Sequence, residues 1–194
     1  MNKNSDFKEA LFTNARTYRN FVTSEVTESD IKALYELSKF APTASNLCPM
    51  RVSFVRSQTA KDNIIAAVAE GNKAKVQSAP LTAIIAYDSA FTDHMEKLAP
   101  HMNAEAFRAK PQTELDGIAI ENTWLYAGFF MTAARSLGFD CGPMSGFDKT
   151  KIDEAFYAQS SWRSLLLVNL GHGDSQSLHP RGQRLSFDEA CALL

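Results

Sequence analysis

A long apolar segment, residues 115–137, constrains the fold more than any other part of the sequence. Its large apolar side chains, such as Trp124 and Phe130, fall on nearly every face of a helix, and Gly138 follows as a C-terminal cap. A helix on the surface of a globular protein instead carries its apolar residues in one stripe. We therefore expect this helix to be buried all round, by a sheet on one side or by a second chain on the other.

The length and composition indicate one globular domain over residues 1–194. Of these residues 45% are apolar and 22% charged, and a chain of this size buries roughly 70% of its unfolded surface. Lysine and arginine number 20 against 22 acidic residues, so the dense cationic surface of a nucleic-acid binder is absent. The length also excludes a dehydrogenase with separate dinucleotide and substrate domains.

The N-terminal residues, the longest apolar run and the cysteines together indicate the cellular compartment of the protein. Residues 1–8 are polar and lack the apolar core of a signal peptide. The longest apolar run, residues 125–134, is about half the length that a bilayer requires. Cys48, Cys141 and Cys191 form no Cys-x-x-Cys pair, which argues against a disulfide framework or a zinc site. We expect a cytoplasmic protein.

Hydrophobic periodicity predicts a single α+β domain. The expected strands cover residues 51–56, 81–87, 139–142 and 165–170, and the expected helices include residues 5–14, 59–70 and 115–137. A further helix is predicted after a cap at Thr27/Asp30 and should end before Pro42. Its expected buried residues are Ile31, Leu34, Tyr35 and Leu37. Two more helices are predicted to start at a cap at Asp148 and at a capping box formed by Ser186 and Glu189. Gly71 is expected to close the helix at 59–70. The irregular residues 89–112 are typical of a lid or specificity insert.

Familiar catalytic motifs are missing. The sequence has no Gly-x-Gly-x-x-Gly after a strand, no phosphate-binding P-loop and no Gly-x-Ser-x-Gly. His94 and His101 are seven residues apart, as are His172 and His179, which suits no metal site, so we expect no metal. Cys48 is a candidate nucleophile, although a small buried residue is the more common role for such a cysteine.

Cationic and amide side chains gather in loops beside the predicted elements. Each of them alone is typical of solvated surface, but together they can clamp a phosphate and face the polar edge of a ring cofactor. The set comprises Arg16, Thr17, Arg19, Asn72, Lys75, Arg181 and Arg184.

The amino-acid sequences of these loops are similar to segments of a known protein family. Ala-Arg-Thr-Tyr-Arg-Asn-Phe at 15–21 resembles the Arg-Ser-x-Arg-x-Phe segment of the nitroreductase family of flavin enzymes. Ala-Pro-Thr-Ala-Ser-Asn-Leu-Cys-Pro-Met-Arg at 41–51 resembles that family's Ala-Pro-Ser-x-x-Asn-x-Gln-Pro-Trp-x segment. Asn72-x-x-Lys75, residues 137–148 and Arg184-Leu185 follow in the family's order. Residues 143–148 and 184–194 read most like the RutE-like branch of malonic semialdehyde reductases.

The resemblance implies a nitroreductase-like fold, with a mainly antiparallel central sheet flanked by helices, and FMN bound between two identical subunits. Arg16, Thr17 and Arg19 would hold the phosphate and ring edge, with Arg184 and Arg181 completing the phosphate site. Asn72 and Lys75 would face the pyrimidine side of the ring. Pro143, Met144, Ser145 and Gly146 would line its N5 edge, and Pro42, Thr43, Ala44 and Asn46 would reach the flavin of the partner chain.

The sequence departs from the family pattern at three places. Ala15 replaces an arginine of many relatives, Cys48-Pro49-Met50 replaces Gln-Pro-Trp, and Ser145 replaces a glutamate found in several nitroreductases. The change at Ala15 removes a cation from the phosphate site, and the other two change the residues at the bottom of the ligand pocket. They put nitroaromatic reduction in doubt more than flavin binding.

The implied activity is NAD(P)H oxidation by ping-pong hydride transfer through flavin N5. Lys75 and Arg16 are candidates for stabilising the reduced flavin. The resemblance favours reduction of malonic semialdehyde to 3-hydroxypropionate in pyrimidine catabolism, with Arg108 and Lys110 as candidate partners of its carboxylate. Three alternatives stay open: a broad nitro or quinone reductase, a flavin-binding protein without turnover, and a thiol hydrolase that uses Cys48.

Overall fold

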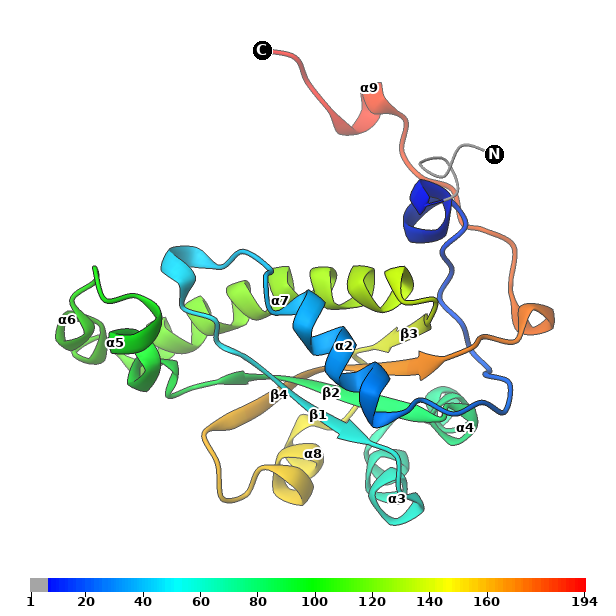
Figure 1. Cartoon of the computed structure of the whole chain (residues 1–194), viewed down its shortest axis with the longest axis horizontal. Coiled ribbons are helices and arrows are strands. Elements are labelled where there is room, and N and C mark those ends of the chain that lie inside the picture. The colour runs from blue at the N-terminus through cyan, green and yellow to red at the C-terminus, as the bar shows by residue number, and fades with distance from the viewer. Residues whose placement is uncertain (1–6) are drawn as a thin grey trace.

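The computed structural model describes residues 7–194 and centres on a four-stranded sheet (Figure 1). The strands are β1 (Met50–Val55), β2 (Leu81–Asp88), β3 (Asp140–Met144) and β4 (Trp162–Gly171). Their order is β1-β2-β4-β3, and every neighbouring pair is antiparallel. The expected α+β fold with an antiparallel sheet is therefore confirmed, and each predicted strand lies within three residues of its observed bounds.

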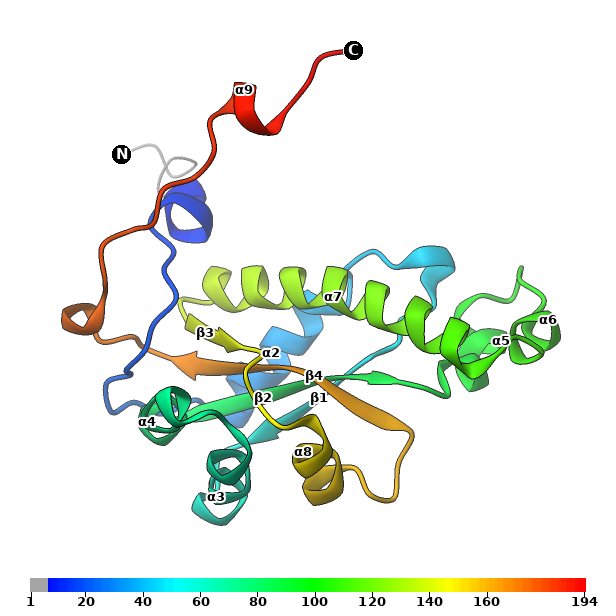
Figure 2. The same ribbon diagram turned by 180° about the vertical axis from the view of Figure 1, so that it is seen from behind.

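Helices cover both faces of the sheet, as the views from front and back show (Figures 1 and 2). One layer holds α2 (Glu28–Ser38) and α7 (Gln112–Ser136), and the other holds α3 (Gln58–Ala67), α4 (Glu70–Ser78) and α8 (Lys149–Phe156). Because side chains alternate along a strand, Leu81, Ala83 and Ile85 of β2 face the first layer while Ile84 faces the second. This two-sided burial explains why β2 is mostly apolar.

The long helix α7 is covered on one side only within the chain. Its inner face buries residues such as Phe130, which is 1% exposed and packs against Phe54. Its outer face leaves Trp124, Leu125 and Phe129 between 45% and 48% exposed. The helix ends as predicted, with Gly138 at φ +84°. Burial all round is thus not achieved by this chain alone.

The predicted helix at 59–70 is wrong in its C-terminal end. The chain instead forms α3, breaks at Val68 and starts α4, which contains Gly71. Val68 takes an extended conformation and bridges to Phe147, while the N–H of Asp148 donates to the carbonyl of Ala67 at 2.8 Å. Pairing with the segment after β3 therefore interrupts the helix, and Asn72 lies on α4 rather than in a loop.

The remaining elements are short. The caps at Thr27, Asp148 and Ser186 are confirmed, although Tyr35 and Leu37 of α2 are exposed where burial was predicted. The expected helix at 5–14 begins outside the described residues. The remaining short elements are the π-helix η1 (Glu9–Thr13), the 3-10 helices η2 (Ala44–Asn46), η3 (Phe91–His94) and η4 (Ser175–Ser177), and the α-helices α5 (Met95–Leu98), α6 (Ala104–Arg108) and α9 (Phe187–Ala190). Across residues 7–194, no helix is both long and apolar enough to cross a membrane.

The segment after η1 lies across the end of the sheet. The N–H of Tyr18 donates to the carbonyl of Cys141 at 3.2 Å, and Phe21 bridges to Gly173. A Cβ atom at Gly173 would lie 2.0 Å from a carbon of the Tyr18 ring, and one at Gly142 would lie 2.8 Å from the Tyr18 carbonyl. Both glycines are needed because the segment approaches the sheet so closely.

We expect Gly173→Ala to lower the free energy of unfolding by about 1–3 kcal/mol, since overpacking forces the Tyr18 ring to move. Gly117→Ala in α7 is the matched control, because a Cβ atom there meets nothing within 4 Å and alanine favours the helix by up to about 1 kcal/mol. Urea denaturation followed by circular dichroism measures both variants. Equal stabilities would contradict the packing role of Gly173.

Candidate functional site

A cavity of about 850 Å³, which we call the cationic cavity, opens at the C-terminal end of α7. It is bounded by residues 12–19, α4, the start of β3 and residues 177–184. Its cationic lining residues are Arg16, Arg19, Lys75, Arg135, Arg181 and Arg184, and neither aspartate nor glutamate lines it. Pro143 also lines it, so residues from four predicted segments converge here.

Neutral acceptors hold all six cations. Arg16 donates to the carbonyl of His179, and Arg19 Nη1 lies 2.6 Å from Nε2 of the same residue. Because arginine only donates, this Nε2 must be an acceptor. Carbonyl oxygens of residues 11, 13, 15, 182 and 183 accept from Arg135, Arg181 and Arg184. Among residues 7–194, no hydrogen-bonded carboxylate therefore compensates the positive charge of the cavity.

Two cations of the insert pair with carboxylates instead. Arg108 Nη2 lies 2.7 Å from a carboxylate oxygen of Glu96, and Lys110 pairs with Glu114. These pairs occupy the two residues that were predicted to bind the acceptor carboxylate, so the structure argues against that role. The cationic cavity gathers several guanidinium groups that have no carboxylate partner among residues 7–194, and a phosphate matches their geometry.

Lys75 and Asn72 connect the cavity to the segment after β3. Lys75 Nζ donates to Oδ1 of Asn72 at 2.6 Å, and Nδ2 of Asn72 donates to the carbonyl of Gly146 at 3.3 Å. Burial, and then the charge of Arg19, lower the pKa of the Lys75 ammonium. A bound anion opposes both effects. Ser145 is exposed in this segment, whereas the side chain of Met144 is buried in the core.

The other predicted cofactor residues lie elsewhere. Pro42, Thr43 and Ala44 belong to the loop before β1, where the N–H of Ala44 donates to Oδ1 of Asn122 at 2.6 Å. This loop lies toward the N-terminal half of α7, away from the cationic cavity (Figure 1). The loop is strained: Ser45, Asn46 and Cys48 have φ of 48°, 59° and 43° and are the non-glycine residues with positive φ in the described chain. Such strain gathers at functional sites.

A second cavity of about 880 Å³, which we call the aromatic cleft, begins beside this loop. It lies between α2, β1, α5 and α7 and is lined by aromatic side chains including Tyr126 and Trp162. Asn46, Cys48 and the insert residues His94, Lys97 and Leu98 also line it. The amide Nδ2 of Asn46 donates to the carbonyl of Leu98 at 2.8 Å, which joins the loop to the insert.

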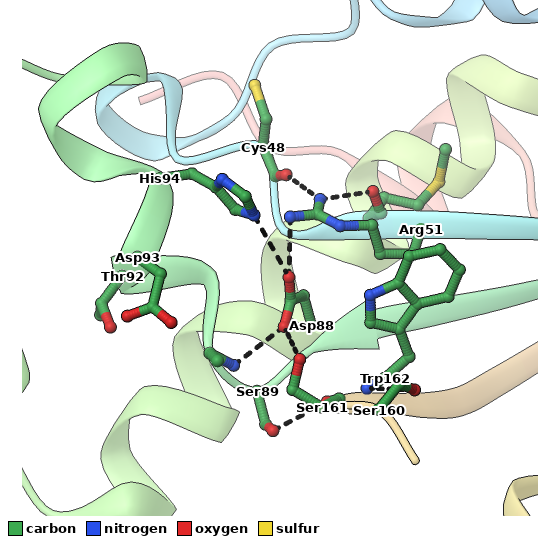
Figure 3. Close-up of polar contacts among 12 residues, drawn as sticks. Cys48, Arg51, Asp88, Ser89, Thr92, Asp93, His94, Ser160, Ser161 and Trp162 are labelled. Atoms are coloured by element: carbon green, nitrogen blue, oxygen red, sulfur yellow. Dashed lines mark hydrogen bonds and ion pairs between the residues drawn. The ribbon is translucent and has the colours of Figure 1, made fainter. Parts of the chain in front are cut away.

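A buried carboxylate lies behind the cleft (Figure 3). Oδ2 of Asp88 accepts from Arg51 at 2.7 Å, and its Oδ1 accepts from the Ser161 hydroxyl at 2.6 Å and the Ala90 N–H at 3.0 Å. These bonds tie β1 and β2 to the start of β4. Sequence reasoning missed this cluster because its members are spread over 110 residues and only the fold brings them together.

Sequence reasoning also missed Arg135 and His179 at the cationic cavity. Arg135 was not singled out in the sequence, and His179 was considered only as half of an unsuitable metal pair. The Cys48 thiol lies 3.3 Å from Asn46 Oδ1 and 3.7 Å from Thr43 Oγ1. No histidine among the described residues bonds to it, so the Cys–His pair of a thiol hydrolase is not formed.

Comparison with known proteins identifies the class. Residues 13–172 match the model of the nitroreductase family. A protein of Stenotrophomonas maltophilia, provisionally named an NADH dehydrogenase/NAD(P)H nitroreductase, is 46% identical and aligns over 95% of this chain and 94% of its own. A similarly named protein of Ralstonia nicotianae is 39% identical over 96% of this chain and 95% of its own. The chain belongs to the nitroreductase family.

Solved structures agree on the fold. A nitroreductase-type protein from Bacillus subtilis superposes with a TM-score of 0.86 at 22% identity, over 98% of this chain and 99% of its own. Another, from Exiguobacterium sibiricum and solved in complex with FMN, gives 0.84 at 20% identity over 97% of both chains. The expected nitroreductase-like fold is confirmed.

We expect sulfate to stabilise the ligand-free protein through the cationic cavity. At five times its dissociation constant, sulfate contributes about 1 kcal/mol, or ~2–4 °C in unfolding temperature for a chain of this size. Arg19→Gln should lose at least half of that shift, since it removes a donor at the cavity. Differential scanning fluorimetry, with chloride at equal ionic strength as the reference salt, measures the change.

The control for Arg19→Gln is Lys151→Gln, because Lys151 lies on α8 and 3.8 Å from the carboxylate of Asp148. This variant should keep the full sulfate shift. Equal shifts in the two variants would mean that sulfate acts elsewhere or without a site.

Proposed function

We propose that this chain is an FMN-dependent NAD(P)H oxidoreductase that reduces malonic semialdehyde to 3-hydroxypropionate. The observation that carries the cofactor assignment is the set of six cations held only by neutral acceptors. A site of this kind favours a strongly anionic ligand such as a phosphate monoester. The family membership and the FMN in the Exiguobacterium sibiricum structure support the same choice.

The residues present fit FMN. Arg16, Thr17 and Arg19, with Arg181 and Arg184 opposite, would hold the phosphate. His179 would orient Arg16 through its carbonyl and Arg19 through its Nε2. Asn72, Lys75 and the segment 143–146 would receive the ring, which suits their link through the Gly146 carbonyl.

When bound, FMN supplies a hydride carrier at N5 that a nicotinamide reduces and an acceptor reoxidises in a ping-pong cycle. Lys75 and Arg16 would then place positive charge toward the pyrimidine edge of the ring, where negative charge develops on reduction. Burial and the charge of Arg19 lower the pKa of Lys75 in the ligand-free chain, and the negative charge of a bound anion would act in the opposite direction.

A second copy of the chain is part of the proposal. Residues 42–46 lie toward the N-terminal half of α7, away from the cationic cavity (Figure 1), so one chain does not bring them to the same ring. The outer face of α7 exposes Trp124, Leu125 and Phe129. The C-terminal arm, residues 178–194, stands away from the body of its own chain (Figures 1 and 2) and exposes Leu185 and Phe187. Burial of these surfaces between two copies supports a homodimer with FMN at the interface.

The acceptor assignment rests on the segments 143–148 and 184–194, which read like the malonic semialdehyde branch. Ser145 in place of a glutamate also departs from the pattern of several nitroreductases. Broad reduction of nitro or quinone compounds is the second candidate, and the names of the relatives favour it.

We expect anaerobic NADPH to bleach the flavin bands of the FMN-loaded protein and malonic semialdehyde to restore them. In steady state, kcat/KM for malonic semialdehyde should exceed that for nitrobenzene and for a neutral quinone by tenfold or more, about 1.4 kcal/mol, because its carboxylate can pair with Lys97 in the aromatic cleft. Reversed rates would establish the nitro or quinone reductase instead. If the absorption spectrum shows no bands of protein-bound flavin after addition of FMN, the cofactor assignment is wrong.

We expect the wild-type protein to sediment at twice the 21.4 kDa mass of the chain. Leu125→Glu should shift it to the single-chain mass and weaken FMN binding, since it buries a carboxylate in an apolar interface. Thr150→Glu, on an exposed part of α8, is the control and should stay dimeric. A wild-type protein of single-chain mass would contradict the dimer.

A further inference from the structure

The aromatic cleft contains a histidine that the family resemblance assigns to no role. His94 lies in η3, within the insert, and its side chain is half-exposed and lines the cleft. Its Nε2 lies 3.8 Å from Oδ2 of the buried Asp88 (Figure 3). Within residues 7–194, no group bonds to the other ring nitrogen, Nδ1. The ring therefore has a carboxylate on one side and the open cleft beside it.

The carboxylate behind His94 is well fixed. Asp88 is 3% exposed and holds its two oxygens on three donors, from Arg51, Ser161 and the backbone of Ala90. Asp88 lies on the Nε2 side of the imidazole without a hydrogen bond to it, an arrangement in which a carboxylate behind a histidine can orient the ring. Nδ1 is therefore the nitrogen left to exchange a proton with a ligand in the cleft.

Two other charged groups lie near the ring. Arg51 binds the same oxygen, Oδ2 of Asp88, that His94 Nε2 faces, and Asp93 lies 4.0 Å from Arg108. Lys97 lines the same cleft and has no carboxylate partner in the described part of the chain. A cation there suits an acceptor that carries a carboxylate of its own.

We propose that His94, positioned by Asp88, donates the proton that completes reduction of an aldehyde in the aromatic cleft. This inference rests on the proposed function, in which Asn46 at the mouth of the cleft reaches the flavin of the partner chain. Reduction adds a hydride, from the reduced cofactor, to the carbonyl carbon and a proton to the oxygen. As the C=O π bond breaks, the Nδ1–H bond of the imidazolium breaks and an O–H bond forms. Neutral His94 then regains a proton from water.

The first experiment compares His94→Gln with His101→Gln in the FMN-loaded dimer by stopped-flow reoxidation. His101 belongs to the same insert and is exposed but does not line the cleft. Malonic semialdehyde needs a proton from the protein, whereas ferricyanide takes electrons alone. The ratio of the aldehyde rate to the ferricyanide rate should fall on the order of 100-fold in His94→Gln, the usual contribution of a general acid. It should stay at the wild-type value in His101→Gln.

The second experiment does not depend on turnover. Diethyl pyrocarbonate should modify both His94 and His101 of the wild-type dimer, as read by mass spectrometry of their peptides. Added 3-hydroxypropionate should slow modification of His94 several-fold and leave that of His101 unchanged, because only His94 would contact the bound product.

The outcomes separate the two proposals. A wild-type flavin that NADPH reduces but malonic semialdehyde does not reoxidise overturns the proposed acceptor, and the role of His94 with it. Wild-type reoxidation with an unchanged ratio in His94→Gln overturns the role of His94 alone. Equal modification of His94 with and without 3-hydroxypropionate also overturns it, because a proton donor must contact the ligand.

Discussion

The packing of α7 on the sheet is the interaction from which both cavities follow. Its inner face buries Phe130 and its neighbours against the strands, and burial of large apolar side chains dominates the stability of such a layer. The same helix supplies Arg135 to the cationic cavity near one end, while Asn122 fixes the strained loop through the N–H of Ala44. One rigid element thus sets the separation of the two half-sites.

The electrostatics of the cationic cavity act against stability. Six like charges around one cavity repel each other, and neutral acceptors orient them without cancelling the charge. Carboxylates in their place would stabilise the empty chain but would compete with a phosphate for the same donors. The arrangement therefore gives up stability in the empty protein in favour of ligand binding, as functional sites commonly do.

The sequence was informative where one segment decides its own structure. The strands, the caps at Thr27 and Asp148 and the end of α7 at Gly138 were predicted because a local pattern specifies each. The break at Val68 was not, because a bridge to Phe147 causes it. The same limit applies to the sites. Motifs could indicate which loops carry cations, but the convergence of Arg135 with His179, or of Arg51 with Asp88, depends on tertiary packing.

The two cavities differ in a way that matches two kinds of ligand. In the aromatic cleft, Lys32, Lys39 and Arg51 each pair with a carboxylate, so the cleft attracts anions only weakly. In the cationic cavity, no carboxylate of the described residues lines the wall. A cofactor must stay bound through many turnovers, whereas an acceptor must leave after each one. Strong uncompensated charge therefore suits the cofactor phosphate. A nearly neutral cleft, with Lys97 as its unpaired cation among the described residues, suits a small anionic substrate that binds and departs quickly.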